Sequence, residues 1–407
     1  MIAANEVWVT GVGVVSAAGP GTDALRLLLA RSGTAVERQP CLGGRSAALA
    51  PTPPPTGWAR RLDRSARLFA AACESAWEDA GMPATILDPD RCGVIEGSSL
   101  GPMAGLLAEH RAAGPAGAGM NATRSVRASH LIRFMSGAGG AAFAQRHGLA
   151  GPVFAMSAGS VSAAFAMAEA WVKLAFGLLD VVVAGGGETP LDPEVIACFD
   201  AAGVLAPPDA VPPCRPFDRD RCGTVLGEGA GAIVLERAEH ARRRGAIPRA
   251  ILAGVGASCE SHSAVAPDPR GIGVTRAVRA ALERTDPAEI GWIKAHGTGT
   301  PANDAAECRG LAAALGPALK DTWLTSLKPA LGHCLGASAA VEAVAAVLAL
   351  DEGLVPATVG TSRIDPDLPR CAVATSIRQD HRPAALLLAE SFGGRCAAAV
   401  LRRPERG

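Results

Sequence analysis

The chain has 407 residues, 49% of them hydrophobic, so it can bury a large core and form two or three domain-sized units. Lys and Arg together number 39, as do Asp and Glu, and this balance excludes a global field that attracts nucleic acid or an anionic membrane. Only 4% of the residues are aromatic and none is tyrosine, which argues against a base-stacking surface. No uninterrupted apolar run is long enough to span a membrane.

The eleven cysteines are scattered, and no two of them form a C-x-x-C pair. Residues 1–6 contain neither the basic nor the apolar segment of a secretory signal. We therefore expect a cytoplasmic protein with reduced thiols, most of which fill the core, and we expect no metal site.

Two segments, 6–13 and 250–257, share a pattern in which an apolar strand runs into a glycine turn. This repeat suggests two similar and closely packed halves, 1–249 and 250–407, each opening on a core strand. Strands that alternate with helices indicate a layered α/β fold. Further strands are expected at 92–95, 181–184, 232–235, 292–295 and 385–388, and Ala-rich helices at 64–80, 160–179 and 336–350.

The segment 151–164 is the first that could carry chemistry. An apolar strand ends there at small residues, and a long helix begins at about Ser160. A side chain at that point lies at the positive end of the helix dipole, where developing negative charge is stabilised. The simpler interpretation is that Ser160 is the N-cap of the helix, the commonest role of a serine there.

A second segment, 293–307, delivers His296 from a strand into a loop of glycines and threonines. A lone histidine is more often a core residue with satisfied hydrogen bonds. The neighbouring hydroxyls and glycines make a loop that faces a ligand more plausible.

A third segment, 325–339, places Lys328 and His333 five residues apart around a turn that leads into an Ala-rich helix. Both residues could belong to a site. The simpler interpretation is a solvated lysine and a histidine that caps the helix.

Together these residues resemble the β-ketoacyl-acyl-carrier-protein synthases. That family includes the elongating enzymes of fatty acid synthesis and the ketosynthase and chain-length-factor subunits of type II polyketide synthases. The resemblance runs over nearly the whole chain. It is carried by VTGVGVVS at 9–16, RPFDRDR at 215–221, GEGAG at 227–231, HGTGTP at 296–301 and the stretch 328–337. It implies the thiolase fold, in which two similar βαβαβαββ halves form five layers, α-β-α-β-α.

The family uses a Cys-His-His triad supported by a lysine. In the family register the nucleophile falls on Ser160, so this chain carries serine where the family has cysteine. The resemblance implies that His296 and His333 are the catalytic histidines and that Lys328 supports them.

The resemblance also implies how substrate is held. Thr298 and Thr300 would contact the carrier arm of the extender unit, and Phe392, followed by Gly393, would gate the malonyl site. The family's end signature, G-F-G-G-T-N, reads SFGGRC at 391–396, and Ala339 stands where glycine is usual. Both departures stiffen or crowd the loops around the site.

The same resemblance implies the partners. No cofactor is needed, because acyl substrates arrive on the phosphopantetheine of an acyl carrier protein. Arg60, Arg64 and Arg67 are expected on one helix face that could steer this acidic carrier, although a solvated basic face is an equal alternative. A homodimer, or a heterodimer with another ketosynthase-like subunit, is expected to form through the edge strand at 151–156.

Serine changes the expected chemistry, because its hydroxyl is a far weaker acid than a thiol and needs a general base. Its oxyester is also less reactive toward a carbon nucleophile than a thioester. The favoured hypothesis is a ketosynthase-like acyltransferase that acts on acyl-carrier-protein thioesters in fatty acid or polyketide biosynthesis, with Ser160 accepting the acyl group. The alternatives are a non-condensing chain-length-factor-like subunit paired with an intact ketosynthase, and a protein that only holds an acyl-carrier complex.

Overall fold

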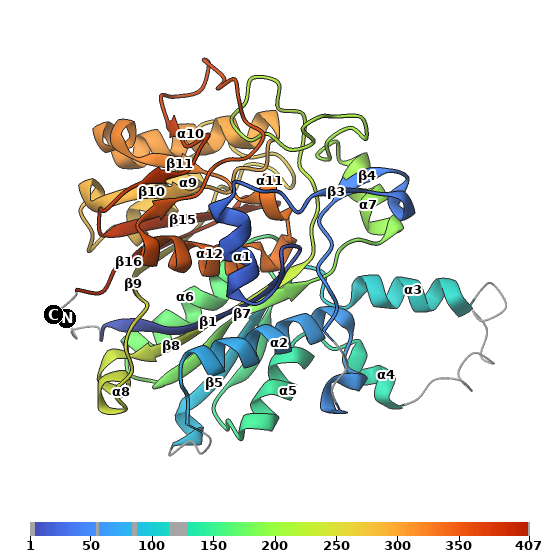
Figure 1. Cartoon of the computed structure of the whole chain (residues 1–407), viewed down its shortest axis with the longest axis vertical. Helices are drawn as coiled ribbons and strands as arrows, with labels where there is room; N and C mark the ends of the chain where they lie inside the picture. Colours follow the sequence, from blue (N-terminus) through green and yellow to red (C-terminus); the bar gives the residue numbers. More distant parts are fainter. Residues whose placement is uncertain (1–4, 54–56, 84–87, 114–127, 406–407) are drawn as a thin grey trace.

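The computed structural model describes residues 5–53, 57–83, 88–113 and 128–405. Two sheets of five main strands form its frame (Figure 1). The first sheet has the order β6-β5-β7-β8-β1, and the second has the order β11-β10-β15-β16-β9. The strands of the first are β1 (Val7–Ser16), β5 (Cys92–Gly97), β6 (Val153–Met156), β7 (Val181–Glu188) and β8 (Gly229–Arg237). Those of the second are β9 (Ala250–Cys259), β10 (Ile290–Lys294), β11 (Trp323–Thr325), β15 (Ala384–Ser391) and β16 (Arg395–Arg402).

The two sheets have the same topology. Numbered along the chain within each half, both orders read 3-2-4-5-1. In each half the second, third and fourth strands pair in parallel, whereas the fifth pairs antiparallel with the fourth and the first. A short antiparallel contact between β1 and β9, the last strand in each order, joins the two sheets into one continuous path of strands. The expected internal repeat is therefore confirmed at the level of strand order.

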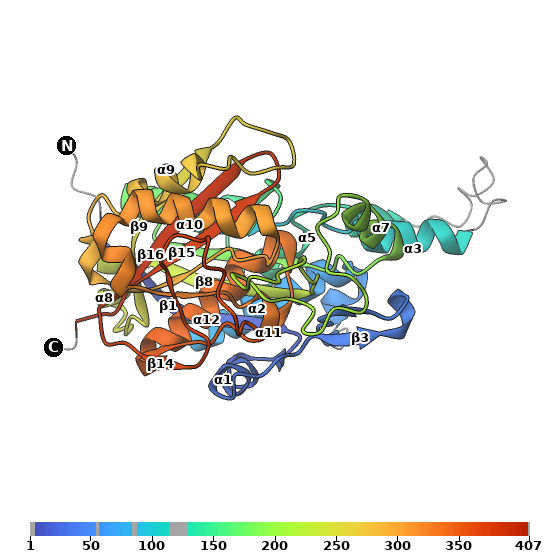
Figure 2. The ribbon, with the colours of Figure 1, turned by 90° about the horizontal axis from the view of Figure 1, so that it is seen from above.

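Helices complete five layers (Figures 1 and 2). Two helices, α6 (Ser162–Ala175) and α12 (Ser338–Glu352), lie between the sheets and contact strands of both. The outer faces are covered by α2 (Arg64–Asp79) and α5 (Ala138–His147) on the first sheet, and by α9 (Ile272–Ala281), with α10 (Pro301–Leu315) beside it, on the second. The expected α-β-α-β-α arrangement is confirmed.

The middle layer explains the Ala-rich composition of 336–350. Every residue of α12 from Ser338 to Leu350 is buried, because the helix is covered on both sides. Small side chains let the two sheets approach such a helix closely. Only its last two residues, Asp351 and Glu352, are exposed.

Glycines in the two opening strands allow a second close approach. A Cβ on Gly13 of β1 would lie 2.1 Å from the backbone oxygen of Ala72 in α2. A Cβ on Gly256 of β9 would lie 2.0 Å from the backbone oxygen of Ala277 in α9. In each half, a glycine on the first strand thus allows an outer helix to pack closely against that strand.

The remaining elements are short or peripheral, and α3 extends from the layered body in both views (Figures 1 and 2). They are α1 (Thr22–Ala30), α3 (Met103–Ala113), α4 (Ala128–Arg133), α7 (Pro193–Ala201), α8 (Ala238–Arg243), α11 (Lys328–Leu331), β2 (Gly19–Pro20), β3 (Glu37–Gln39), β4 (Arg45–Ala47), β12 (Leu354–Val355), β13 (Ala372–Val373) and β14 (Arg378–Gln379). Among the described helices, none is both long and apolar enough to cross a membrane.

Candidate active site

The two halves bring four candidate side chains to one place. Ser160 comes from the turn between β6 and α6, whereas His296 follows β10, and Lys328 and His333 belong to α11 and the turn after it. The Oγ of Ser160 lies 3.0 Å from Nε2 of His333. The rings of His296 and His333 are 5.3 Å apart, nearly perpendicular. Lys328 Nζ donates to the backbone oxygen of His296 at 2.5 Å.

The turn at Ser160 aims its hydroxyl at His333. Strand β6 ends at Met156, and Gly159 adopts the left-handed conformation, with φ of 69°, that reverses the chain before the helix. Helix α6 begins at Ser162 with Val161 as its N-cap, so Ser160 precedes the cap and makes no capping bond. The N-cap interpretation of Ser160 is therefore wrong, and the helix starts two residues later than predicted.

His333 is held at both ring nitrogens. Its Nδ1 lies 2.8 Å from the hydroxyl of Ser338, the first residue of α12. Burial, followed by the nearby charges of Lys328 and Lys294, lowers the pKa of His333 well below its ordinary value of 6.5. The ring is therefore neutral near pH 7, and one nitrogen can accept a proton. The interpretation of His333 as a helix cap is not what the structure shows.

His296 is fixed through its backbone. Both carboxylate oxygens of Glu307, on α10, accept hydrogen bonds, one from the His296 N–H at 2.5 Å and one from the Gly297 N–H at 2.8 Å. Burial, Lys328, His333 and Lys294 together lower the pKa of His296 well below 6.5. The histidine is thus a buried, neutral neighbour of His333.

Lys328 is completely buried, so the interpretation of a solvated lysine is wrong. It lies 3.0 Å from Oε1 of Glu342, whose Oε2 lies 2.5 Å from the buried ammonium of Lys294. Lys294 also donates to the backbone oxygen of Leu388 at 2.5 Å. Burial alone would raise the pKa of Glu342, but the two ammonium groups lower it. Two lysines thus share one carboxylate, and both lysines lower the pKa of the two histidines.

Comparison with known proteins identifies the family of the chain. Family models described as the beta-ketoacyl synthase N-terminal and C-terminal domains match residues 55–241 and 249–362. The chain belongs to the beta-ketoacyl synthase family. It is 31% identical to the tetracenomycin polyketide synthase ketoacyl synthase alpha subunit of Streptomyces glaucescens, over 99% of this chain and 98% of the relative.

Two solved structures of beta-ketoacyl synthases are similar over the full length. One is a type II PKS acyl-carrier protein in complex with its ketosynthase bound to the hexaketide, with a TM-score of 0.90 and 26% identity, covering 99% of this chain and 100% of that one. The other is the ishigamide ketosynthase/chain length factor, with a TM-score of 0.88 and 26% identity, covering 99% and 100%.

The residues predicted to contact substrate lie in the loop after β10 and at the end of the β15–β16 hairpin. The hydroxyls of Thr298 and Thr300 lie 3.0 Å apart, and Thr298 is buried. Phe392 is 41% exposed, and its ring stacks on Phe199 with a centroid distance of 6.3 Å. The N–H of Gly393 donates to the backbone oxygen of Ala264 at 2.7 Å. This bond ties the end of the β15–β16 hairpin to the loop after β9.

Ser391, where the family signature has glycine, contacts Ser160 directly. Its Oγ accepts a hydrogen bond from the backbone N–H of Ser160 at 2.9 Å. Sequence reasoning noted this substitution but not its contact. It also missed Glu342 and Lys294 as partners of Lys328, and Ser338 as the partner of His333. A glutamate inside the apolar helix α12 was the available signal for Glu342, because a buried carboxylate requires a partner.

The prediction that Arg60, Arg64 and Arg67 share one helix face is wrong. The carboxylate of Asp63 accepts from the Ser65 N–H and caps α2, so the helix begins at Arg64, and Arg60 lies in the preceding 3₁₀ turn at Gly57–Arg61. Arg64 is half-buried and forms a bidentate ion pair with Glu228, with N–O distances of 2.5 and 2.7 Å. Its charge is therefore used inside the protein rather than on a basic face.

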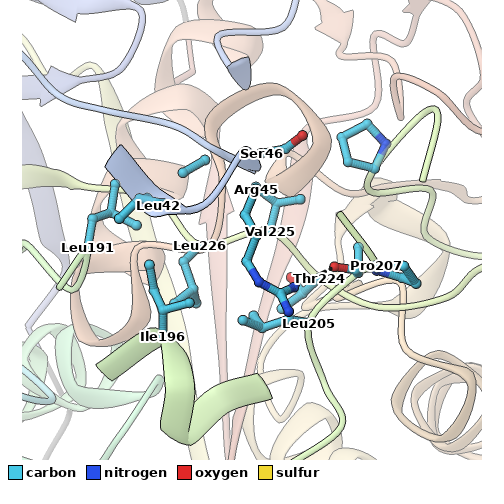
Figure 3. Close-up of a pocket in the computed structure, with 13 residues that line it drawn as sticks. Leu42, Arg45, Ser46, Leu191, Ile196, Leu205, Pro207, Thr224, Val225 and Leu226 are labelled. Carbon is cyan, nitrogen blue, oxygen red and sulfur yellow. Dashed lines mark hydrogen bonds between the residues drawn. The ribbon is translucent and has the colours of Figure 1, made fainter. Parts of the chain in front are cut away.

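A pocket is lined mainly by apolar side chains (Figure 3) and has about 350 Å³ of empty space, part of which is open solvent. Arg45 projects into it and is paired with Asp200 at 2.7 Å. The wall residue Leu226 pairs with His333 through a β-bridge, and Phe199, the partner of Phe392, packs in the same apolar cluster. The pocket is thus connected by packing to Phe392. Its aliphatic wall includes Leu42, Leu191, Ile196, Leu205 and Leu226.

Within the described residues, one group of three potential metal ligands occurs, formed by Glu260, Glu390 and Cys396 within 4.8 Å of one another. Burial, with the charges of Glu307 and Glu260, raises the pKa of Glu390 well above 4.5. Burial likewise raises the pKa of the Cys396 thiol. A protonated carboxyl and thiol are poor metal ligands at neutral pH.

Proposed function

We propose that the protein is a ketosynthase-like acyltransferase of polyketide biosynthesis that accepts an acyl group from a carrier-protein thioester on Ser160. The observation that carries this proposal is the 3.0 Å contact between Ser160 Oγ and His333 Nε2. A serine hydroxyl is a useful nucleophile only when a base lies within hydrogen-bond reach. His333 meets this condition, because its lowered pKa leaves it neutral.

The acyl transfer follows from the geometry. With the Nδ1 proton directed to Ser338, Nε2 takes the Ser160 proton while Oγ attacks the thioester carbonyl carbon. The resulting tetrahedral oxyanion collapses, the carbon–sulfur bond breaks, and His333 returns the proton to the departing thiolate. His296 borders His333, and the charges of Lys328 and Lys294 help to keep His333 neutral. The buried Lys294–Glu342–Lys328 cluster holds Lys328 in place.

The substrate arrangement is part of the proposal. The hydroxyls of Thr298 and Thr300 face each other at 3.0 Å and would contact the carrier arm. Phe392, whose backbone is followed by the anchored Gly393, would open and close the entrance with Phe199. No cofactor enters this scheme, because phosphopantetheine arrives with the carrier protein. We assign the reaction to the cytoplasm on the ground that all eleven cysteines are free thiols.

We also propose that the protein acts as a dimer, homomeric or with a second ketosynthase-like subunit. Strand β6 is at the edge of the first sheet, and all four of its residues are only half-buried. An apolar edge strand that stays partly exposed is a natural site for pairing with another chain.

The experiment that tests the proposal is intact-mass analysis of the purified protein incubated with an acyl carrier protein that bears a thioester. One acyl adduct is expected, and Ser160→Ala abolishes it. His333→Ala slows adduct formation strongly, whereas Ser160→Cys accelerates it, because a thiolate at a helix N-terminus needs less help from a base. His240→Ala, which removes a histidine paired with Glu236 away from the site, is the matched control and leaves the rate unchanged.

A second candidate is a non-condensing, chain-length-factor-like subunit. The contact between Ser391 and the Ser160 N–H favours it, because this contact occupies a backbone donor beside the nucleophile position. One of the similar structures is described as a ketosynthase/chain length factor. If the wild type never acylates, and Ser160→Ala leaves the product output of a partner ketosynthase unchanged, this role replaces the first.

A further inference from the structure

The hydroxyl of Ser391 occupies the backbone N–H of Ser160. The N–O distance is 2.9 Å, and Ser391 is the last residue of β15. The approach depends on Gly159, since a Cβ at that position would lie 2.1 Å from the Ser391 hydroxyl. A glycine before Ser160 and a serine on the facing hairpin therefore fit each other.

The backbone N–H of Ser160 is placed to stabilise the oxyanion that forms during acyl transfer. When Ser160 Oγ bonds to a carbonyl carbon, the carbonyl oxygen becomes an anion close to the residue's own backbone N–H. A preorganised N–H at such a place stabilises the oxyanion, and the loss of one donor of this kind slows acyl transfer about 100- to 1000-fold. One N–H with a single proton cannot fully serve a resident hydroxyl and an oxyanion together.

We propose that Ser391 is a positioning residue that competes with the oxyanion for the Ser160 N–H and thereby sets the rate of acyl transfer. The inference rests on Ser160 as acyl acceptor, the proposed function, and adds the residue that limits it. The hydroxyl has to leave the N–H before the oxyanion forms, and it returns once the acyl group is in place. The ester carbonyl is then less polarised, so the same contact slows hydrolysis of the acyl-enzyme.

The surroundings of Ser391 allow such a movement. Among the described residues, the Ser391 hydroxyl has no hydrogen-bond acceptor for its own proton. Its cross-strand neighbour Arg395 donates to the Phe392 backbone oxygen at 3.4 Å, and its guanidinium lies beside the same turn. The side chain can therefore leave the N–H without breaking a second hydrogen bond.

The test compares two reactions at one strong nucleophile. In a Ser160→Cys background, Ser391→Ala and Ser391→Gly are each compared with unaltered Ser391. The first reaction is acetyl transfer from 4-nitrophenyl acetate, in which sulfur attacks the carbonyl carbon, an oxyanion forms, and 4-nitrophenolate leaves. The second is alkylation by iodoacetamide, in which sulfur displaces iodide and no oxyanion forms.

Both Ser391 variants are expected to raise the maximal rate of acetyl transfer about 3- to 10-fold, the factor that corresponds to one net hydrogen bond. The ester concentration at half-maximal rate and the alkylation rate stay unchanged. The lifetime of the acetyl adduct shortens by a similar factor, because deacylation passes through the same oxyanion. Ser157→Ala is the matched control, since its hydroxyl contacts the Ser99 backbone oxygen and not Ser160.

An unchanged or slower acetyl transfer overturns the inference. So does an equal rise in acetyl transfer and alkylation, because that pattern reports easier access to the nucleophile rather than a freed donor. Neither reaction uses a carrier protein. A wild type that never accepts an acyl group from a carrier thioester therefore removes the proposed function and leaves this result standing.

Discussion

Replacing Glu342 by glutamine tests the charge cluster behind the histidines. The substitution keeps the shape of the side chain and removes the one carboxylate that lies between the ammonium groups of Lys294 and Lys328, at 2.5 and 3.0 Å. All three side chains are at most 4% exposed, so water cannot replace the lost charge. Each ammonium keeps only one backbone carbonyl as a strong acceptor, on Leu388 and His296.

Breaking a buried ion pair in this way costs about 3–5 kcal/mol of unfolding free energy. At about 2 °C per kcal/mol for a large domain, the melting temperature of Glu342→Gln should fall by roughly 6–10 °C. Glu352→Gln is the matched control. It makes the same change on the same helix at an exposed pair with Arg26 and should alter stability by less than about 0.5 kcal/mol.

The deficit should also depend on pH with a defined sign. Burial already lowers the pKa of Lys294 from 10.5, and the loss of Glu342 lowers it further. Between that lowered value and 10.5, the unfolded chain binds more protons than the folded one, so stability increases with pH. Glu342→Gln should therefore recover part of its deficit as the pH rises toward 10.5, as measured by calorimetry. A variant as stable as the wild type, or a deficit that grows with pH, would refute the reasoning.

Three other expectations concern the base, the turn and the dimer. The rate of Ser160 acylation should be independent of pH from about 8 down to 6.5 and fall only below that, because the pKa of His333 lies well below 6.5. A midpoint above pH 7 in a stopped-flow pH–rate profile would contradict this expectation. Gly336→Ala should lower stability by about 1–3 kcal/mol in denaturant titration, since its Cβ would lie 2.3 Å from the backbone nitrogen of Ser99, and a neutral result is the contrary outcome. Phe154→Glu places a charge on the half-buried edge strand β6 and should give a monomer in light scattering, whereas an intact dimer at micromolar concentration counts against the proposed interface.

Local patterns in the sequence predicted most of the fold. Composition and periodicity predicted the glycine-bearing strands β1 and β9 and the Ala-rich helices α6 and α12. The family motifs then predicted that these elements pack in five layers. Strands β11 and β16 were not predicted. The first has only three residues, and the second is alanine-rich and carries little β-propensity of its own, so its pairing between β15 and β9 makes it a strand.

The candidate site divides in the same way. The motifs identified Ser160, His296, Lys328 and His333 because each lies in a short stretch of unusual residues. The position of Ser160 relative to the helix was missed, because the N-cap depends on where the turn at Gly159 closes.

What only the tertiary structure decided is which charges and donors are already in use. The sequence predicts Arg64 as a basic surface residue, yet it forms an ion pair with Glu228, 164 positions away. Ser391 is 231 positions from the N–H that it occupies. Contacts at such separations depend on how two sheets and five layers pack, and the burial that sets the pKa of His333 arises only when both halves close around it. Sequence determined the kinds of groups present, and packing determined their partners.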